Sequence, residues 1–226
     1  MTLSVASFAS MDKLGEALSE RIGNNLIEAL CEKGTARMLL SGGTTPWPVY
    51  TLLSRLELPW KSIELGLVDE RFVPNSSDHS NERNIRESLL QMNGARATFF
   101  PMVLDAEDSS NNLAQIRESY HGFSEHTDVV ILGMGTDGHT ASLFPGDTAS
   151  EAIMNGNESS VFMTTAPSYP TERITCSSAL LLKASHMYLI IKGNEKWDIL
   201  ASASENLPIK RFLTARNDIQ IYYASS

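Results

Sequence analysis

The sequence is poor in basic residues. It has 18 lysines and arginines against 27 aspartates and glutamates, which gives a formal net charge of −9 at pH 7. Proteins that bind nucleic acid or anionic membranes present basic surfaces, so we expect neither as a partner. An anionic small ligand stays compatible with this charge, but it would need a local cationic pocket.

Cysteines and long apolar runs are also scarce. The two cysteines, Cys31 and Cys176, lie far apart and outside any C-x-x-C spacing, so we expect two buried thiols in a reducing compartment. No apolar stretch approaches the roughly 20 residues of a membrane span. Asp12 and Glu16 interrupt the N-terminal region where a signal peptide would be apolar. Together these absences predict a cytoplasmic protein.

Signatures of several enzyme classes are missing as well. H-E-x-x-H, C-x-x-C and G-x-S-x-G do not occur. Their absence removes the usual signals of zinc proteases, thiol oxidoreductases and serine hydrolases.

The composition fits one globular domain, which we expect to span residues 1–226. Of the 226 residues, 42% are hydrophobic, enough for a sizeable core. Leu14, Leu18, Ile22, Leu26 and Leu30 recur every four residues and predict one face of an amphipathic helix.

Further elements follow in alternation. Short apolar runs predict strands at residues 37–40, 63–68, 128–132, 187–191 and 219–223. Thr45 and Pro46 are typical of the N-cap and first residue of a helix that runs toward Leu56. Helices are also expected over residues 84–91 and 109–120 and through Trp197 and Leu200.

This alternation predicts an α/β fold with a mostly parallel central sheet and helices on both faces. The apolar runs lack a period of two, as strands covered on both faces should. In such folds ligands bind at the carboxyl ends of the strands. Each polar, glycine-rich segment of this chain directly follows a predicted strand, so these segments are the candidates for function.

The first segment is residues 41–46 (SGGTTP), between a predicted strand and a predicted helix. Its glycines would expose backbone N–H groups to an anion, which makes a phosphate cradle one interpretation. An ordinary turn that needs a positive φ at glycine is equally compatible. It is not a Walker A loop, because the lysine of that motif is missing.

The second segment is residues 69–74 (DERFVP), with Ser80 and Asn81 a few residues later. Charged residues at the end of an apolar strand have no packing reason to cluster. Arg71 could bind a phosphate through its guanidinium group, and Asp69 could orient another polar group. The alternative is a solvated strand end with an internal salt bridge.

The third segment, residues 133–146, is the most specific. Its first six residues satisfy G-x-G-x-x-G, but Pro145 and Gly146 leave no room for the long helix of a dinucleotide-binding site. His139 follows an aspartate on this glycine-rich loop, and histidine is the natural general acid or base at neutral pH. We therefore interpret His139 as a functional residue.

Two later cations complete the candidates. Arg173 precedes a predicted strand, and Lys196 follows another through a glycine turn. Taken one at a time, each would be an ordinary surface charge. The four other histidines, His79, His121, His126 and His186, lie in polar contexts without a functional signal.

Together these segments resemble the 6-phosphogluconolactonase family. Residues 41–46, 69–74 with Ser80 and Asn81, and 135–145 (GTDGHTASLFP) occur in the order and spacing of that family. Residues 173–175 and 193–196 are similar to its later segments. The resemblance spans nearly the whole chain, and D-G-H-T-A-S-L-F-P is its most specific element.

The resemblance implies an enzyme, with hydrolysis of 6-phospho-D-glucono-1,5-lactone to 6-phospho-D-gluconate as the expected reaction in the oxidative pentose phosphate pathway. It also implies the Rossmann-like sheet shared with sugar-phosphate isomerases and deaminases. Neither a metal nor an organic cofactor is expected. The expected partner is the sugar-phosphate lactone, bound by a monomer or small homo-oligomer.

The resemblance also implies residue roles. His139 would be the catalytic acid and base, and Asp69 would orient either His139 or a sugar hydroxyl. The residues expected to bind the substrate or its phosphate are Ser41, Gly42, Gly43, Thr44, Arg71, Asn81, Gly138, Arg173 and Lys196.

Two alternatives remain open on the sequence. A glucosamine-6-phosphate deaminase or related isomerase has the same kind of loop, but resembles D-G-H-I-A-F-N-E-P there, whereas this chain has Thr140 to Phe144 and no glutamate. A non-catalytic sugar-phosphate sensor would keep the phosphate site, but it would not need His139.

Overall fold

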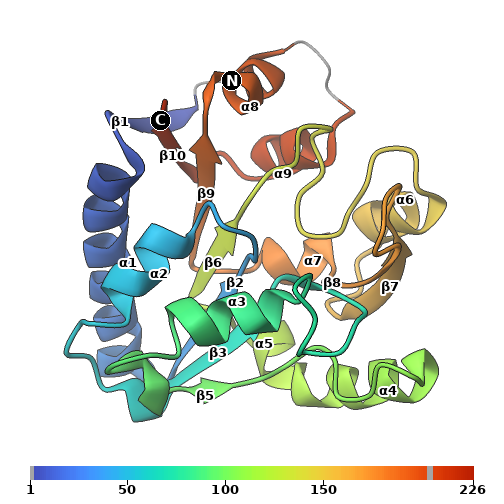
Figure 1. The fold of residues 1–226 in the computed structure, drawn as a ribbon, viewed down its shortest axis with the longest axis horizontal. Coiled ribbons are helices and arrows are strands. Elements are labelled where there is room, and N and C mark those ends of the chain that lie inside the picture. The colour runs from blue at the N-terminus through green and yellow to red at the C-terminus, as the bar shows by residue number, and fades with distance from the viewer. Residues whose placement is uncertain (1–2, 203–205) are drawn as a thin grey trace.

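The computed structural model describes residues 3–202 and 206–226. Within these residues a seven-stranded sheet forms the centre of the fold, in the order β1-β10-β9-β6-β2-β3-β5 (Figure 1). Every neighbouring pair in it is parallel, so the predicted α/β fold is confirmed. Its strands are β1 (Ser4–Phe8), β2 (Ala36–Leu40), β3 (Ile63–Leu67), β5 (Thr98–Phe99), β6 (Val129–Leu132), β9 (His186–Lys192) and β10 (Gln220–Ala224).

Helices cover both faces of this sheet. All residues of β6 are 0% exposed, although successive side chains of a strand point to opposite faces. α1 (Met11–Lys33) contacts β2, β6 and β10. Side chains of Tyr120 and Phe123, at the junction of α4 (Ser109–Ser119) and α5 (His121–Glu125), pack over Gly66 of β3.

The predicted apolar face of α1 is confirmed. Leu14, Leu18, Ile22 and Leu26 are 0% exposed. Cys31 lies off this face and is exposed, whereas Cys176 is buried. The expectation of two buried thiols was therefore wrong for Cys31.

Two helices begin elsewhere than predicted. α2 (Trp47–Leu53) starts after Pro46, and no side chain caps it. Of the two N–H groups that a Thr45 cap could bind, that of Trp47 donates to the Thr44 carbonyl at 3.3 Å, and Pro48 has none. α3 (Asn81–Ser88) starts three residues before the predicted position. Ser80 caps it by accepting a hydrogen bond from the Arg83 N–H at 3.2 Å.

The sequence did not predict a second, antiparallel sheet. Its order is β4-β8-β7, and it is formed by β4 (Asp69–Arg71), β7 (Val161–Thr165) and β8 (Glu172–Cys176). Only Val68 separates β3 from β4, so the chain passes directly from the central sheet into the small one. Arg173 does not precede a strand as expected but lies inside β8, because the strand begins with charged residues rather than an apolar run.

The remaining helices are α6 (Thr148–Asn155), α7 (Ser178–Leu181), α8 (Asn194–Ala201) and α9 (Pro208–Ala215), with short 3-10 turns η1 (Trp60–Ser62) and η2 (Gly94–Arg96). Among the described residues, no helix has the length and apolar character needed to cross a membrane. Because parallel strands share one carboxyl edge, the loops that follow β2, β3, β6 and β9 meet there.

Candidate active site

These loops and the small sheet enclose a pocket of about 370 Å3. The predicted site residues that line it are Ser41, Gly42, Gly43, Asp69, Arg71, Asn81, His139, Arg173 and Lys196. Two predicted residues lie elsewhere. Thr44 lines a surface hollow beside Trp47, and the Gly138 carbonyl accepts a hydrogen bond from the Ile209 N–H at 3.2 Å.

His139 is held by Asp137 on the loop after β6. The imidazole Nδ1 lies 2.5 Å from Asp137 Oδ1, and the His139 backbone N–H donates to the same oxygen at 3.1 Å. A carboxylate at Nδ1 favours the tautomer with the proton there, which leaves Nε2 as a free base. Burial by itself would raise the pKa of Asp137, but the hydrogen bonds and charge of His139 outweigh it and lower that pKa.

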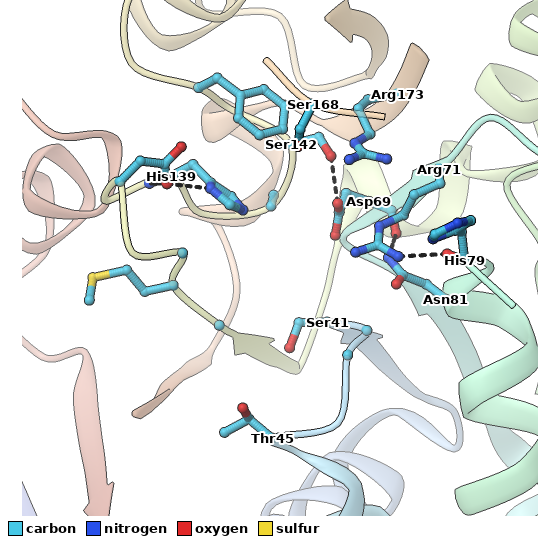
Figure 2. Close-up of a pocket in the computed structure, with 18 of the residues that line it drawn as sticks. Ser41, Thr45, Asp69, Arg71, His79, Asn81, His139, Ser142, Ser168 and Arg173 are labelled. Atoms are coloured by element: carbon cyan, nitrogen blue, oxygen red, sulfur yellow. Dashed lines mark hydrogen bonds and ion pairs between the residues drawn. The ribbon is translucent and has the colours of Figure 1, made fainter. Parts of the chain in front are cut away.

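Asp69 does not contact His139. Its Oδ2 accepts a hydrogen bond from Ser142 Oγ at 2.6 Å, and the side chain is 8% exposed. Figure 2 shows Asp69 beside Arg71 and Arg173, across the pocket from His139. Asp137, which the sequence interpretation left out of the site, therefore occupies the position beside the imidazole that was considered for Asp69.

The arginines come from two strands of the small sheet. Arg71 and Arg173 are direct partners in the β4–β8 register. Arg71 Nη1 donates to the His79 carbonyl at 2.6 Å, while the buried Nη1 of Arg173 has no partner within the described residues. Burial and then the charge of Arg71 lower the pKa of Arg173. An anion bound in the pocket would offset both effects, because a nearby negative charge raises the pKa of an arginine.

Lys196 reaches the same pocket from α8. Burial lowers its pKa, and the charge of Glu195 opposes that effect. A half-buried ammonium group that lines the same pocket as two arginines adds to a local positive field in an otherwise acidic protein.

The loop after β2 carries two glycines, and each is required for a different structural reason. Gly43 has a φ of 80°, a conformation that favours glycine. At Gly42 a Cβ would lie 1.9 Å from Asn81 Oδ1, so the loop and α3 approach too closely for any side chain. Both glycines serve the turn and also line the pocket.

Two buried polar atoms at this end of the pocket lack partners in the part of the chain that the structure describes, Ser41 Oγ and Asn81 Oδ1. The Asn81 amide nitrogen donates to the Asp69 carbonyl at 3.0 Å, which leaves its oxygen as the free group. An amide oxygen only accepts hydrogen bonds, so it would pair with a hydroxyl and not with a phosphate.

Comparison with known proteins identifies the family. A family model for glucosamine-6-phosphate isomerases/6-phosphogluconolactonase matches residues 9–221. The chain belongs to this family. A 6-phosphogluconolactonase of Rhizobium meliloti is 37% identical and aligns over 99% of this chain and 100% of its own length. One from Helicobacter pylori is 33% identical, with 97% of each chain covered.

Solved structures agree with this assignment. A 6-phosphogluconolactonase from Shewanella baltica superposes with a TM-score of 0.90 at 29% identity, covering 99% of this chain and 98% of the other. A putative 6-phosphogluconolactonase from Neisseria gonorrhoeae gives 0.88 at 29% identity, covering 99% and 100%. The predicted resemblance to the 6-phosphogluconolactonase family is confirmed.

In this member of the family, His79 also lines the pocket, contrary to its interpretation as a residue without function. Its carbonyl holds Arg71, and its ring lies edge-on to Tyr169 with centroids 5.5 Å apart. The only sequence signal was its closeness to Asn81. Among the described residues, no cluster of three or more histidines, cysteines or acidic residues could hold a metal ion.

Proposed function

We propose that this chain hydrolyses 6-phospho-D-glucono-1,5-lactone to 6-phospho-D-gluconate, with His139 as general base and then general acid. Membership of the family and the names of its curated relatives support the reaction. The observation that carries the residue roles is the His139–Asp137 pair on one side of a pocket and Arg71 with Arg173 on the other.

The phosphate end of the substrate would bind Arg71 and Arg173, with Lys196 adding charge. A phosphate dianion would supply the acceptor that Arg173 Nη1 lacks and would favour the charged guanidinium against burial. The phosphate is remote from the reacting carbon, so its binding energy serves to fix the geometry of the lactone.

The reaction itself requires one water molecule and one base. His139 Nε2 takes a proton from water as the water oxygen bonds to C1, and the carbonyl becomes an oxyanion. When the carbonyl re-forms, the bond from C1 to the ring oxygen breaks, and His139 returns the proton to that oxygen. The carboxylic acid product then ionises. Acid–base help of this kind contributes roughly 10²–10⁴ in rate.

Substrate hydroxyls between the phosphate and C1 would form hydrogen bonds with Ser41 and Asn81. The free Asn81 Oδ1 is an acceptor, so we assign Asn81 to a sugar hydroxyl. Gly42 and Gly43 line the pocket, and we assign their backbone N–H groups to the oxyanion or another anionic group.

The test is acid release from freshly generated lactone at neutral pH, with and without the protein. Acceleration over spontaneous ring opening is expected, and its absence would contradict the lactonase proposal. Ammonia release from glucosamine 6-phosphate would instead indicate a deaminase. Binding of sugar phosphates without either reaction would indicate a sensor.

We also propose that residues 1–226 act as one cytoplasmic domain, as a monomer or small homo-oligomer, without a metal or organic cofactor. The family match over residues 9–221 and the acidic composition support this view. Size-exclusion chromatography with light scattering, and activity after dialysis against a chelator, would test it.

A further inference from the structure

Glu70 is a buried acid just outside the pocket. It lies in β4 between Asp69 and Arg71, and because side chains alternate along a strand it points away from the face that those two present. It is 1% exposed, and within the described residues no arginine, lysine or histidine forms a salt bridge with it. A buried carboxylate without a cation needs hydrogen bonds to remain in place.

Glu70 accepts four hydrogen bonds, all from its own strand or from the start of α3. Its Oε1 accepts from the backbone N–H groups of Arg71 and Asn81, both at 2.7 Å. Its Oε2 accepts from the Glu82 N–H at 2.7 Å and from Ser80 Oγ at 3.1 Å. The carboxylate thus satisfies helix N–H groups that have no partner inside α3.

These contacts fix the two segments that carry the polar groups of one end of the pocket. Arg71 is bound through its own N–H, and its guanidinium rests on the carbonyl of His79, one residue before the α3 cap. Asn81 is bound through its N–H, and its side chain lies against Gly42 and the Asp69 carbonyl.

We propose that Glu70 is a positioning residue for substrate binding, which holds Arg71 at the phosphate end of the site, and Asn81 beside it at a sugar hydroxyl, without touching the substrate. This inference rests on the proposed lactonase function. His139 lies on a different loop and is held by Asp137. Loss of the Glu70 carboxylate should therefore weaken binding of the phosphate end and leave the acid–base pair intact.

The test compares two substrates that differ only in the phosphate, 6-phosphogluconolactone and glucono-1,5-lactone. In Glu70→Gln the amide NH2 replaces an oxygen that accepts two hydrogen bonds, so the four contacts cannot all persist while size is kept. We expect KM for the phosphorylated lactone to rise about tenfold or more through Arg71, KM for glucono-1,5-lactone to rise clearly less through Asn81, and kcat on both lactones to stay within about threefold of wild type.

Glu82→Gln is the matched control. Glu82 is also a buried glutamate, 2% exposed, but its side chain pairs with Arg86 at 2.8 Å on the same helix. This variant should keep wild-type KM and kcat on both lactones.

An unchanged KM in Glu70→Gln, or an equal loss on both lactones, would overturn the positioning role. If circular dichroism shows that Glu70→Gln does not fold, the same two substrates are compared with Glu70→Asp, whose shorter side chain cannot reach all four donors. An equal loss on both lactones in that variant would also overturn the positioning role. Wild-type protein that hydrolyses neither lactone would instead contradict the proposed function.

Discussion

Arg71 and Arg173 are direct partners across the antiparallel β4–β8 pair, so two guanidinium groups share one wall of the pocket (Figure 2). Like charges on neighbouring strands are unfavourable unless an anion compensates them. Burial lowers the pKa of Arg173, and the charge of Arg71 lowers it further through this same repulsion. The site is therefore arranged for an anionic group even in a protein of net charge −9.

Arg71→Ala should weaken this anion site. We expect KM for the phosphorylated lactone to rise with little change in kcat, because the proposed role of Arg71 is to bind the remote phosphate and not the reacting carbon. Stabilisation by 6-phosphogluconate, about 2.7 kcal/mol for wild type at 100 times Kd, should shrink at equal ligand concentration in a thermal melt. Arg96→Ala, at an exposed position away from the pocket, is the control. A loss confined to kcat would contradict the assignment.

His139→Ala should reduce kcat by roughly 10²–10⁴, with KM and the thermal shift from 6-phosphogluconate nearly unchanged. The reason is that the proposed role of the imidazole is to act on water, while Arg71 and Arg173, the proposed phosphate ligands, lie across the pocket. Steady-state kinetics with freshly prepared lactone provide the measurement. His121→Ala removes an exposed histidine paired with Glu125 and should behave as wild type. If both variants lose activity equally, His139 has no special role.

Glu70 should make stability depend on pH in a definite direction. Burial, with a smaller contribution from the Asp69 charge, raises the pKa of Glu70 from 4.5 to about 7, against the hydrogen bonds donated by Asn81, Glu82 and Arg71. The folded state then holds this proton more tightly than the unfolded state. Its contribution to the free energy of unfolding is full below pH 4.5 and is lost as the pH rises through 7.

Urea unfolding of wild type and Glu70→Gln across this range would measure the effect. The difference between them, wild type minus variant, should fall with rising pH by at most about 1.4 kcal/mol per pH unit. Subtraction removes the contribution of other groups such as Asp137, whose lowered pKa acts in the opposite direction. A flat or rising difference would show that Glu70 stays ionised throughout.

Gly138→Ala should disturb the loop that carries His139. Gly138 has a φ of 82°, and a Cβ there would lie 2.8 Å from Leu207 Cδ1, so both backbone strain and a clash arise. We expect kcat to fall and stability to drop by more than about 1 kcal/mol. Gly146→Ala is the control, because its φ of 76° gives the same strain with no neighbour within 4 Å. Equal losses of stability in the two variants would mean that the Leu207 side chain moves to make room for the added methyl group.

Much of the central sheet was predictable because its information is local. The apolar runs of β2, β3, β6, β9 and β10 and the stripe on α1 are visible in the sequence. Their carboxyl ends then had to share an edge, which brought the glycine-rich loops together.

The small sheet was not predictable in the same way. β4 is Asp-Glu-Arg and β8 begins with Glu172 and Arg173, so neither has the apolar pattern of a strand. Their pairing links residues about a hundred positions apart, and no local signal specifies such a register. The early start of α3 has a similar cause, because Glu70 binds its first N–H groups from another element. His79 lies in the loop before α3, and no local sequence pattern specifies that it lines the pocket.

Ser142 joins the two halves of the pocket. It follows His139 on the loop from the central sheet, yet it bonds to each strand of the small sheet: its Oγ donates to Asp69 at 2.6 Å, its N–H donates to Thr175 Oγ1 at 3.3 Å, and its carbonyl accepts from Thr164 at 2.7 Å. These hydrogen bonds attach the loop that carries His139 to the sheet that carries Arg71 and Arg173. Under the proposed residue roles, Ser142 sets a molecular ruler, by which a sugar phosphate with one carbon more or fewer would bind its phosphate correctly only by misplacing its carbonyl.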